Sequence, residues 1–190
     1  MKGLKTILWV AVVALVALAA TLFTTKSCKP EEEVVAPTFN EYVMEDFNYA
    51  KSFENDSTTV RFYEVETVLN GNVDTLTYDA LAVVSSMTVF SVNDTVYMRT
   101  RTYETGEVVE EKAAGYWVGT APMDSVDFVV PFEKAVELLY STNYPLPAGD
   151  KMTLRKPLDG KTENPLYIFG TVGTHFISVD AMTGEVAPLE

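Results

Sequence analysis

The sequence predicts an α+β fold in which helices pack on an antiparallel β-sheet. Residues 58–118 are rich in Val, Thr, Tyr and Phe and contain turn signals such as Asn70-Gly71, which is typical of an antiparallel meander. Segments at 39–53 and 131–139 instead place apolar residues three and four apart, which is typical of helices. Hydrophobic residues make up 47% of the 190-residue chain, so it can bury a substantial core.

The N-terminus predicts export. Residues 7–23 are apolar except for Thr21 and follow a short basic start, so we interpret residues 1–27 as a signal peptide or signal anchor. If the segment is cleaved before Cys28, this cysteine is the acylated residue of a lipoprotein. If it is retained, ~20 apolar residues are long enough to span a bilayer. Plain secretion is the third alternative, and all three place residues 34–190 outside the cytoplasm, in the periplasm or at the cell surface.

Charge and cysteine content narrow the possible functions. The net charge is −13, from 14 basic and 27 acidic residues, and such a surface repels nucleic acid. Cys28 is the only cysteine, which excludes an internal disulfide and a cysteine-based metal cluster. Residues 28–37 are acidic and contain proline, so we expect a linker between the membrane and the folded part.

Residues 38–125 are predicted to form an antiparallel β-rich region with an N-terminal helix. The helix is expected over 39–53, and a partly extended segment at 46–53 is the alternative. The segment 81–92 has apolar residues on both parities, which indicates a central strand buried on both sides. The predicted strands are 59–69, 73–78, 81–92, 95–103 and 107–118.

Residues 126–190 are predicted to form a second unit, after a boundary at 120–127. Its helix is expected to start with Pro131 at the first helical position. A strand at 152–156 follows, and then a hairpin of 166–169 with 175–179. In the turn after the hairpin, the Asp180 carboxylate is expected to accept backbone amides, Thr183 belongs to the same turn, and Gly184 is expected in a left-handed conformation.

The end of the chain resembles a PepSY domain. The resemblance rests on the pattern Y-x-apolar…V-D-A-x-T-G-E-V, which is carried here by Tyr167, Val179, Asp180, Ala181, Thr183, Gly184, Glu185 and Val186. It covers about residues 126–188 and implies a helix followed by a three-stranded antiparallel sheet. PepSY domains occur in propeptides of secreted metallopeptidases, so the resemblance implies binding to a peptidase or another envelope protein.

A second occurrence of Thr-Gly-Glu-Val lies at 105–108, in addition to the one at 183–186. Each follows a predicted strand. The repetition could mark an internal duplication of a helix-plus-sheet unit, the first beginning near Phe39, but Thr-Gly-Glu is also ordinary turn chemistry, and four residues around a turn are weak evidence for a duplication.

The sequence carries no complete catalytic set, and we expect no enzymatic activity, no cofactor and no metal. His175 is the only histidine, and we expect it to be structural. Glu110 and Glu111 are adjacent on a predicted strand, so their side chains should point to opposite faces rather than form a carboxylate pair.

We therefore expect a non-enzymatic, membrane-tethered protein that binds a partner in the cell envelope, with modulation of a peptidase as the function that the resemblance implies. An exposed sheet edge or the loop 140–147 would supply the contacts, with Tyr140, Tyr144 and Leu146 as candidate residues. The alternative is a structural or accessory subunit of a larger envelope complex.

Overall fold

The computed structural model describes residues 36–159 and 162–189, and the chain from Pro37 onward forms one compact unit. The predicted signal segment, Cys28 and most of the predicted linker lie outside the described residues. Among the described residues, no helix is both long enough and apolar enough to cross a membrane.

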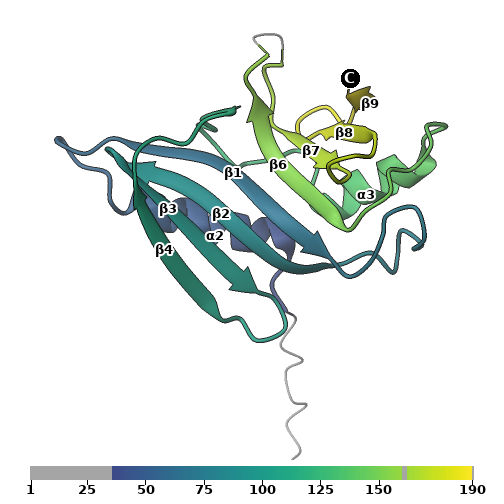
Figure 1. Ribbon diagram of the computed structural model, residues 1–190, viewed down its shortest axis with the longest axis horizontal. Helices are drawn as coiled ribbons and strands as arrows, with labels where there is room; N and C mark the ends of the chain where they lie inside the picture. The colour runs from purple at the N-terminus through teal and green to yellow at the C-terminus, as the bar shows by residue number, and fades with distance from the viewer. Residues whose placement is uncertain (1–35, 160–161, 190) are drawn as a thin grey trace, which may run out of the picture. The chain divides into compact units, whose positions relative to one another are not determined.

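The predicted α+β class is confirmed: two helices pack on an antiparallel sheet that has nine strands in the described part of the chain (Figure 1). Neighbouring strands follow the order β4-β3-β2-β1-β6-β7-β8-β9, and β5 pairs with β6 beside this path. The strands are β1 (Val60–Leu69), β2 (Val83–Val92), β3 (Thr95–Thr102), β4 (Val108–Ala114), β5 (Thr120–Ala121), β6 (Lys151–Pro157), β7 (Leu166–Phe169), β8 (Phe176–Asp180) and β9 (Val186–Leu189).

The two halves of the chain join through β1 and β6 at the centre of the sheet. Their antiparallel register runs from Glu64 opposite Arg155 to Val68 opposite Lys151. Each half therefore has the same layout, a helix followed by a four-stranded meander whose first strand lies at the centre. Pairing between the halves was not predicted, because the sequence contains no local signal for contacts between distant strands.

Helix α2 (Phe39–Lys51) begins at a capping box. The Glu41 amide donates to the Thr38 hydroxyl at 3.3 Å, and the Thr38 amide donates to the Glu41 carboxylate at 2.7 Å, so two amides at the helix start are satisfied. This helix excludes the alternative of an extended segment at 46–53. Helix α3 (Phe132–Ser141) is linked to α2, because the Phe132 amide donates to Asn40 Oδ1 at 2.8 Å.

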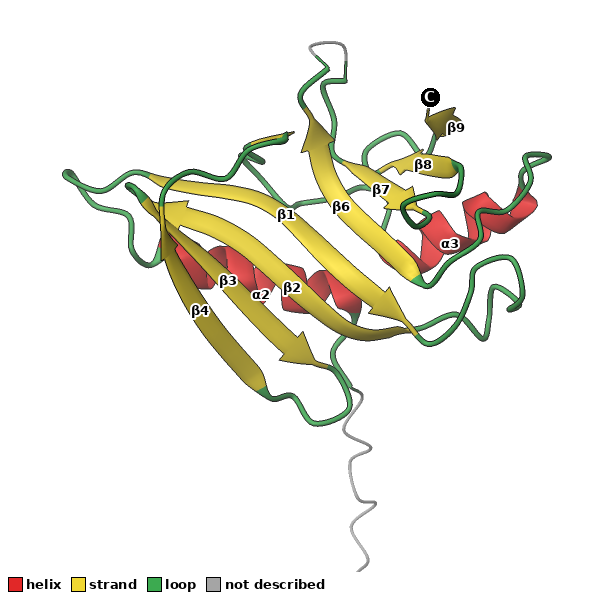
Figure 2. Cartoon of the chain, viewed as in Figure 1, coloured by secondary structure: helices red, strands yellow, loops and turns green. Residues whose placement is uncertain are grey.

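Both helices lie on the same face of the sheet, as Figure 2 shows, and the main core lies between them and the strands. Tyr167 is fully buried there. Its hydroxyl donates to the Val130 carbonyl at 2.9 Å and accepts from the Asn40 amide group at 3.1 Å, so a buried polar group is satisfied on both counts. The largest fully buried side chains of this core include Phe90, Leu139, Met152, Leu154, Phe169 and Ile177.

One predicted strand is wrong. Residues 73–78 form successive turns in the connection between β1 and β2. The Asn72 carbonyl accepts from the Thr75 and Leu76 amides, and the Thr77 carbonyl accepts from the Leu81 amide, so these groups bond locally instead of joining a ladder. Val73 lies in the core with no exposed surface, and this burial explains an apolar residue at position 73 without a strand.

Several predicted boundaries also change. The strand predicted over 107–118 ends at Ala114, because Gly115 takes a positive φ of 129° and turns the chain away. Pro131 is the N-cap rather than the first helical residue. The second meander has four strands instead of three, since Val186–Leu189 pairs with β8. His175 lies just before β8 instead of within it.

Candidate functional site

The predicted turn at 180–184 has a defined geometry. The Asp180 carboxylate accepts the amides of Met182 and Thr183, each at 2.8 Å, and the Asn164 side chain at 3.0 Å. Gly184 has a φ of 77°. Burial alone would raise the pKa of Asp180, but the hydrogen bonds from Asn164, Thr183 and Met182 together lower it. These contacts hold the turn.

The three candidate partner contacts differ in exposure. The Tyr140 hydroxyl donates to the Val73 carbonyl at 2.6 Å, and Leu146 packs against the main core, so both are tied to the fold. Tyr144 is 43% exposed. His175 is nearby, with its Nε2 at 2.8 Å from the Pro145 carbonyl oxygen. In this loop, Tyr144 is the candidate contact that the fold leaves free.

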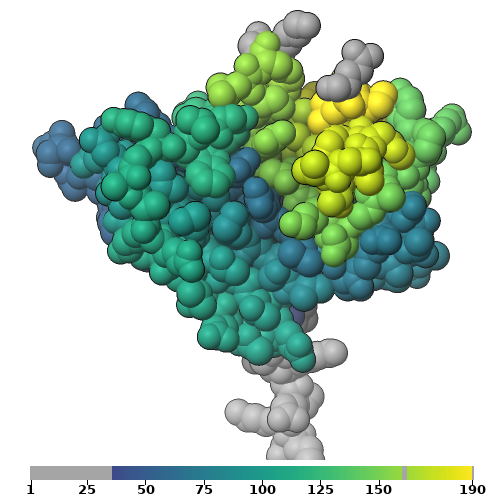
Figure 3. All heavy atoms as spheres, in the orientation of Figure 1, coloured from purple at the N-terminus to yellow at the C-terminus, as the bar shows by residue number. Residues whose placement is uncertain are grey.

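The sheet has a second face, opposite α2 and α3, which we call the helix-free face because no helix of the described residues packs on it (Figure 2). Figure 3 shows the molecule from the side of this face. It carries a small apolar cluster of its own, formed by Tyr63, Val89 and Val96. Trp117 packs on this cluster, together with Met87 and Met98. A chain segment beyond the end of β4 therefore folds back over the sheet.

Trp117 is fixed by a buried carboxylate. Its indole N–H donates to Glu64 Oε1 at 2.8 Å, and Arg155 lies 3.9 Å from the other carboxylate oxygen. Glu64 is almost completely buried. Burial is the main influence and raises the pKa of Glu64, while the hydrogen bond from Trp117 opposes the shift. This contact anchors the loop to the centre of the sheet, where β1 meets β6.

We call residues 115–119, Gly-Tyr-Trp-Val-Gly, the aromatic loop. The side chains on either side of Trp117 point to solvent, since Tyr116 is 69% and Val118 is 82% exposed. Gly115 and Gly119 both have positive φ, 129° and 99°, which other residues rarely adopt. The loop therefore presents two exposed side chains, Tyr116 and Val118, one on each side of the fixed Trp117.

Sequence reasoning missed this loop because it was assigned to the end of a strand. The available signal was the pair of glycines around three large apolar residues, which a regular strand does not require.

The prediction that Glu110 and Glu111 point to opposite faces of the sheet agrees with the strand register. Glu110 lies opposite Arg99 and Glu111 lies opposite Met98, on alternate faces.

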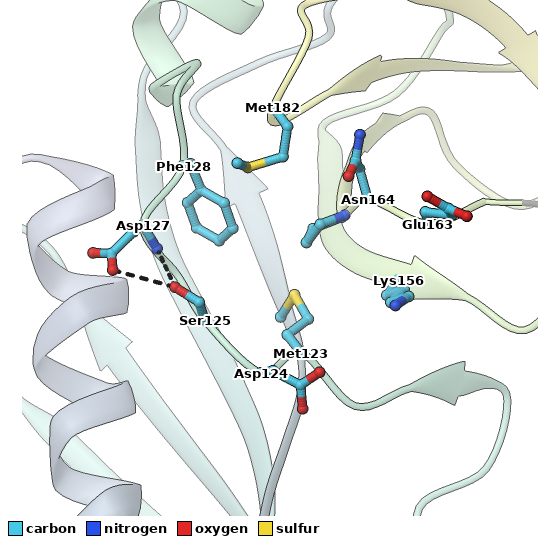
Figure 4. A pocket seen from close by; sticks show the side chains of 10 residues that line it. Met123, Asp124, Ser125, Asp127, Phe128, Lys156, Glu163, Asn164 and Met182 are labelled. Atoms are coloured by element: carbon cyan, nitrogen blue, oxygen red, sulfur yellow. Dashed lines mark hydrogen bonds between the residues drawn. The ribbon is translucent and has the colours of Figure 1, made fainter.

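A pocket of about 210 Å³ lies beside the 180–184 turn (Figure 4). Met123, Phe128 and Met182 form its apolar part, and Lys156 and Glu163 lie at its polar side. Its volume is below the ~300 Å³ at which sites for small molecules begin. Within residues 36–159 and 162–189, no three His, Cys, Asp or Glu side chains are grouped as they would be to hold a metal ion.

No family model and no curated protein sequence matches the chain. The PepSY resemblance therefore stays a prediction. A solved structure, described as "a putative lipoprotein (CD1622) from Clostridium difficile 630", is similar to this chain with a TM-score of 0.50 and 13% identity, over 84% of this chain and 95% of that one. At this identity the likeness shows that the two chains share a fold.

Proposed function

We propose that the chain is a non-enzymatic, membrane-tethered protein of the cell envelope that binds a partner protein through its helix-free face. The observation that carries the proposal is the aromatic loop. Tyr116 and Val118 are exposed beside the anchored Trp117, and aromatic residues on a rigid support are the type of side chain that dominates binding energy in protein interfaces.

Charge favours a basic partner. With a net charge of −13, the chain attracts a positively charged surface from a distance. The rate of association is expected to fall as salt rises, whereas contacts of the aromatic loop act mainly on dissociation. A peptidase is the first partner to test, because the resemblance of residues 165–186 to a PepSY domain implies one.

The tether is proposed to be a lipid on Cys28. The likeness to a chain described as a putative lipoprotein supports this part of the proposal. Metabolic labelling with an alkyne fatty acid tests it: wild type is expected to be labelled and Cys28→Ser unlabelled. A mature N-terminus that still begins at Met1 would instead assign a signal anchor.

Co-purification from crosslinked cells tests the binding function. Wild type is expected to recover a specific envelope protein, and Tyr116→Ala combined with Val118→Ala is expected to lose it. Val172→Ala is the control, because it removes a 93% exposed apolar side chain from the connection between β7 and β8, away from every candidate contact. Equal recovery by the loop variant and the control would contradict the proposed site, and hydrolysis of a peptide, ester or glycoside by the pure protein would contradict the non-enzymatic function.

The activity of the recovered partner then decides its role. If it is a peptidase whose rate changes when the full-length chain is added, the chain is a modulator. Stable co-purification without any change in proteolysis indicates an accessory subunit of a complex.

A further inference from the structure

A groove of about 490 Å³ lies on the helix side of the sheet, between α3 and the connection at 72–82. Its floor is apolar and consists of Leu81, Phe132 and Val136, each at most 8% exposed. Tyr78 and Pro131 also line it. The volume falls in the range of ~300–1,000 Å³ that is typical of ligand sites.

The floor of this α3 groove is preformed. The Phe132 amide is bonded to Asn40 of α2, Val136 lies within α3, and the Leu81 amide donates to the Thr77 carbonyl at 3.2 Å. A ligand would therefore not need to order these groups, which removes one of the main entropic costs of binding.

The rim of the α3 groove is acidic. Asp79, Glu133 and Glu137 contribute three carboxylates, and all three residues are exposed. Among the described residues that line the groove, Lys134 is the one basic residue, and its ammonium group is already paired with Glu137 at 2.9 Å. The rim thus has an excess of negative charge around an apolar floor, which complements an apolar side chain with positive neighbours.

We infer that the α3 groove binds a peptide segment of a partner protein in which one large apolar side chain is flanked by lysine or arginine. The apolar side chain fills the groove above Leu81 and Val136, and the flanking cations pair with the rim carboxylates. A second copy of this chain does not fit this chemistry, because two surfaces with the same excess of carboxylates repel each other. The groove lies on the opposite side of the sheet from the aromatic loop, so the inference goes beyond the proposed function.

Binding of defined peptides to the full-length chain in nanodiscs tests the inference. The probe is a short peptide with a single phenylalanine between two lysine pairs, and binding is followed by calorimetry. Replacing its phenylalanine by alanine is expected to weaken binding by ~10-fold or more, because the apolar burial is lost. Replacing its lysines by glutamates is expected to abolish binding. Equal binding of the phenylalanine and alanine peptides would overturn the inference, since charge alone would then explain the affinity.

Variants of the protein locate the site. Asp79→Asn and Glu133→Gln are each expected to weaken binding about two- to five-fold, the usual range for an exposed charge pair. Glu104→Gln removes the same charge at an exposed position outside the groove and is expected to leave binding unchanged. If all three variants behave alike, the groove is not the site. Self-association of wild type that Asp79→Asn alters would assign the groove to a second copy and also overturn the inference.

The peptide-binding test of the α3 groove can fail or succeed independently of the co-purification test of the proposed function. Tyr116→Ala with Val118→Ala is expected to bind the peptide as wild type does. Loss of peptide binding in that variant would place the peptide on the aromatic loop and overturn the assignment to the α3 groove.

Discussion

The two Thr-Gly-Glu-Val turns occupy corresponding places in the two halves, one between β3 and β4 and the other between β8 and β9. Their backbone hydrogen bonds match. The Gly106 amide donates to the Thr102 carbonyl at 2.8 Å, and the Gly184 amide donates to the Asp180 carbonyl at 2.9 Å. The same four residues thus build the same turn twice.

The surroundings of the two turns differ. In the second half, the Asp180 carboxylate adds hydrogen bonds to the turn, while the corresponding residue of the first half is Thr102. A Cβ atom added to Gly184 would lie 3.0 Å from Leu138, whereas one added to Gly106 would meet nothing within 4 Å. Local sequence determines the turn, and tertiary packing determines how much of the stability depends on it.

The helices of the two halves are also held differently. Helix α3 presents an apolar stripe to the core. Helix α2 adds a buried ion cluster, in which the 1% exposed Asp46 accepts from Arg99 Nε at 2.8 Å and from the Thr88 hydroxyl at 2.7 Å. Arg101 lies 3.1 Å from the same carboxylate, and the ring of Tyr42 stacks on its guanidinium with 4.3 Å between Cζ and the ring centroid. Helix α2 is therefore held by charge pairing in addition to apolar contacts, whereas the buried residues of α3 are apolar.

The largest expected effect follows from this difference. Asp46→Ala removes the buried carboxylate that pairs with the buried Arg101 and the partly buried Arg99, and leaves them only the exposed Glu45, so we expect it to lower the free energy of unfolding by ~3–5 kcal/mol. Glu45→Ala is the control, because its side chain is 53% exposed and its pair with Arg101 should contribute less than ~1 kcal/mol. Chemical denaturation measures both. Similar losses in the two variants would show that the buried cluster does not hold α2.

Substitutions in the two turns should show the next largest effect. Gly184→Val and Gly106→Val each force a β-branched residue into a left-handed conformation, at a cost of ~1–3 kcal/mol. Gly184→Val should be the more destabilising of the two, because it also meets Leu138. Equal melting temperatures of the two variants, or no change in either, would contradict the environment that we describe for these turns.

A smaller effect is expected from Asp180→Asn, about 1 kcal/mol at pH 7, because hydrogen bonds to a charged acceptor are weakened. The pKa of Asp180 is lowered in the folded state, so its contribution is present above the ordinary value of 3.8 and is lost as the pH falls through the folded pKa. The variant and wild type should therefore converge in stability at acidic pH. A constant difference from pH 7 to pH 2 would contradict this.

Glu64 should show the opposite dependence of stability on pH, and its substitution should give the smallest change in the free energy of unfolding. Its pKa is raised on folding, so wild type should lose stability as the pH rises from the ordinary value of 4.5 through the folded pKa. Glu64→Gln keeps an oxygen that can accept from Trp117 and removes the buried charge, so we expect it to be at least as stable as wild type at pH 7. Urea unfolding across this pH range measures it, and a variant with an unchanged pH profile would show that Glu64 does not titrate as described.

The sequence predicted the class of the fold and most elements, because the Val, Thr, Tyr and Phe content and turn signals of 58–118 and the three-four spacing at 39–53 are local signals. It did not predict the pairing of β1 with β6, which joins residues as far as 91 positions apart, at Glu64 and Arg155. The candidate site was missed because residues 115–118 were assigned to the end of a strand, whereas Trp117 lies in a loop and is held by Glu64 of β1. The Asp46 cluster likewise depends on arginines that only the folded sheet brings to the helix.

Site-specific photocrosslinking in living cells tests the central claim most directly, because it reports which side chain touches a partner. Benzoylphenylalanine is placed at position 118, in the aromatic loop, and separately at position 172, where Val172 is 93% exposed in the connection between β7 and β8. We predict a discrete protein adduct from position 118 and none from position 172. No adduct at 118, or the same adducts from both positions, would contradict the claim that the helix-free face binds a partner.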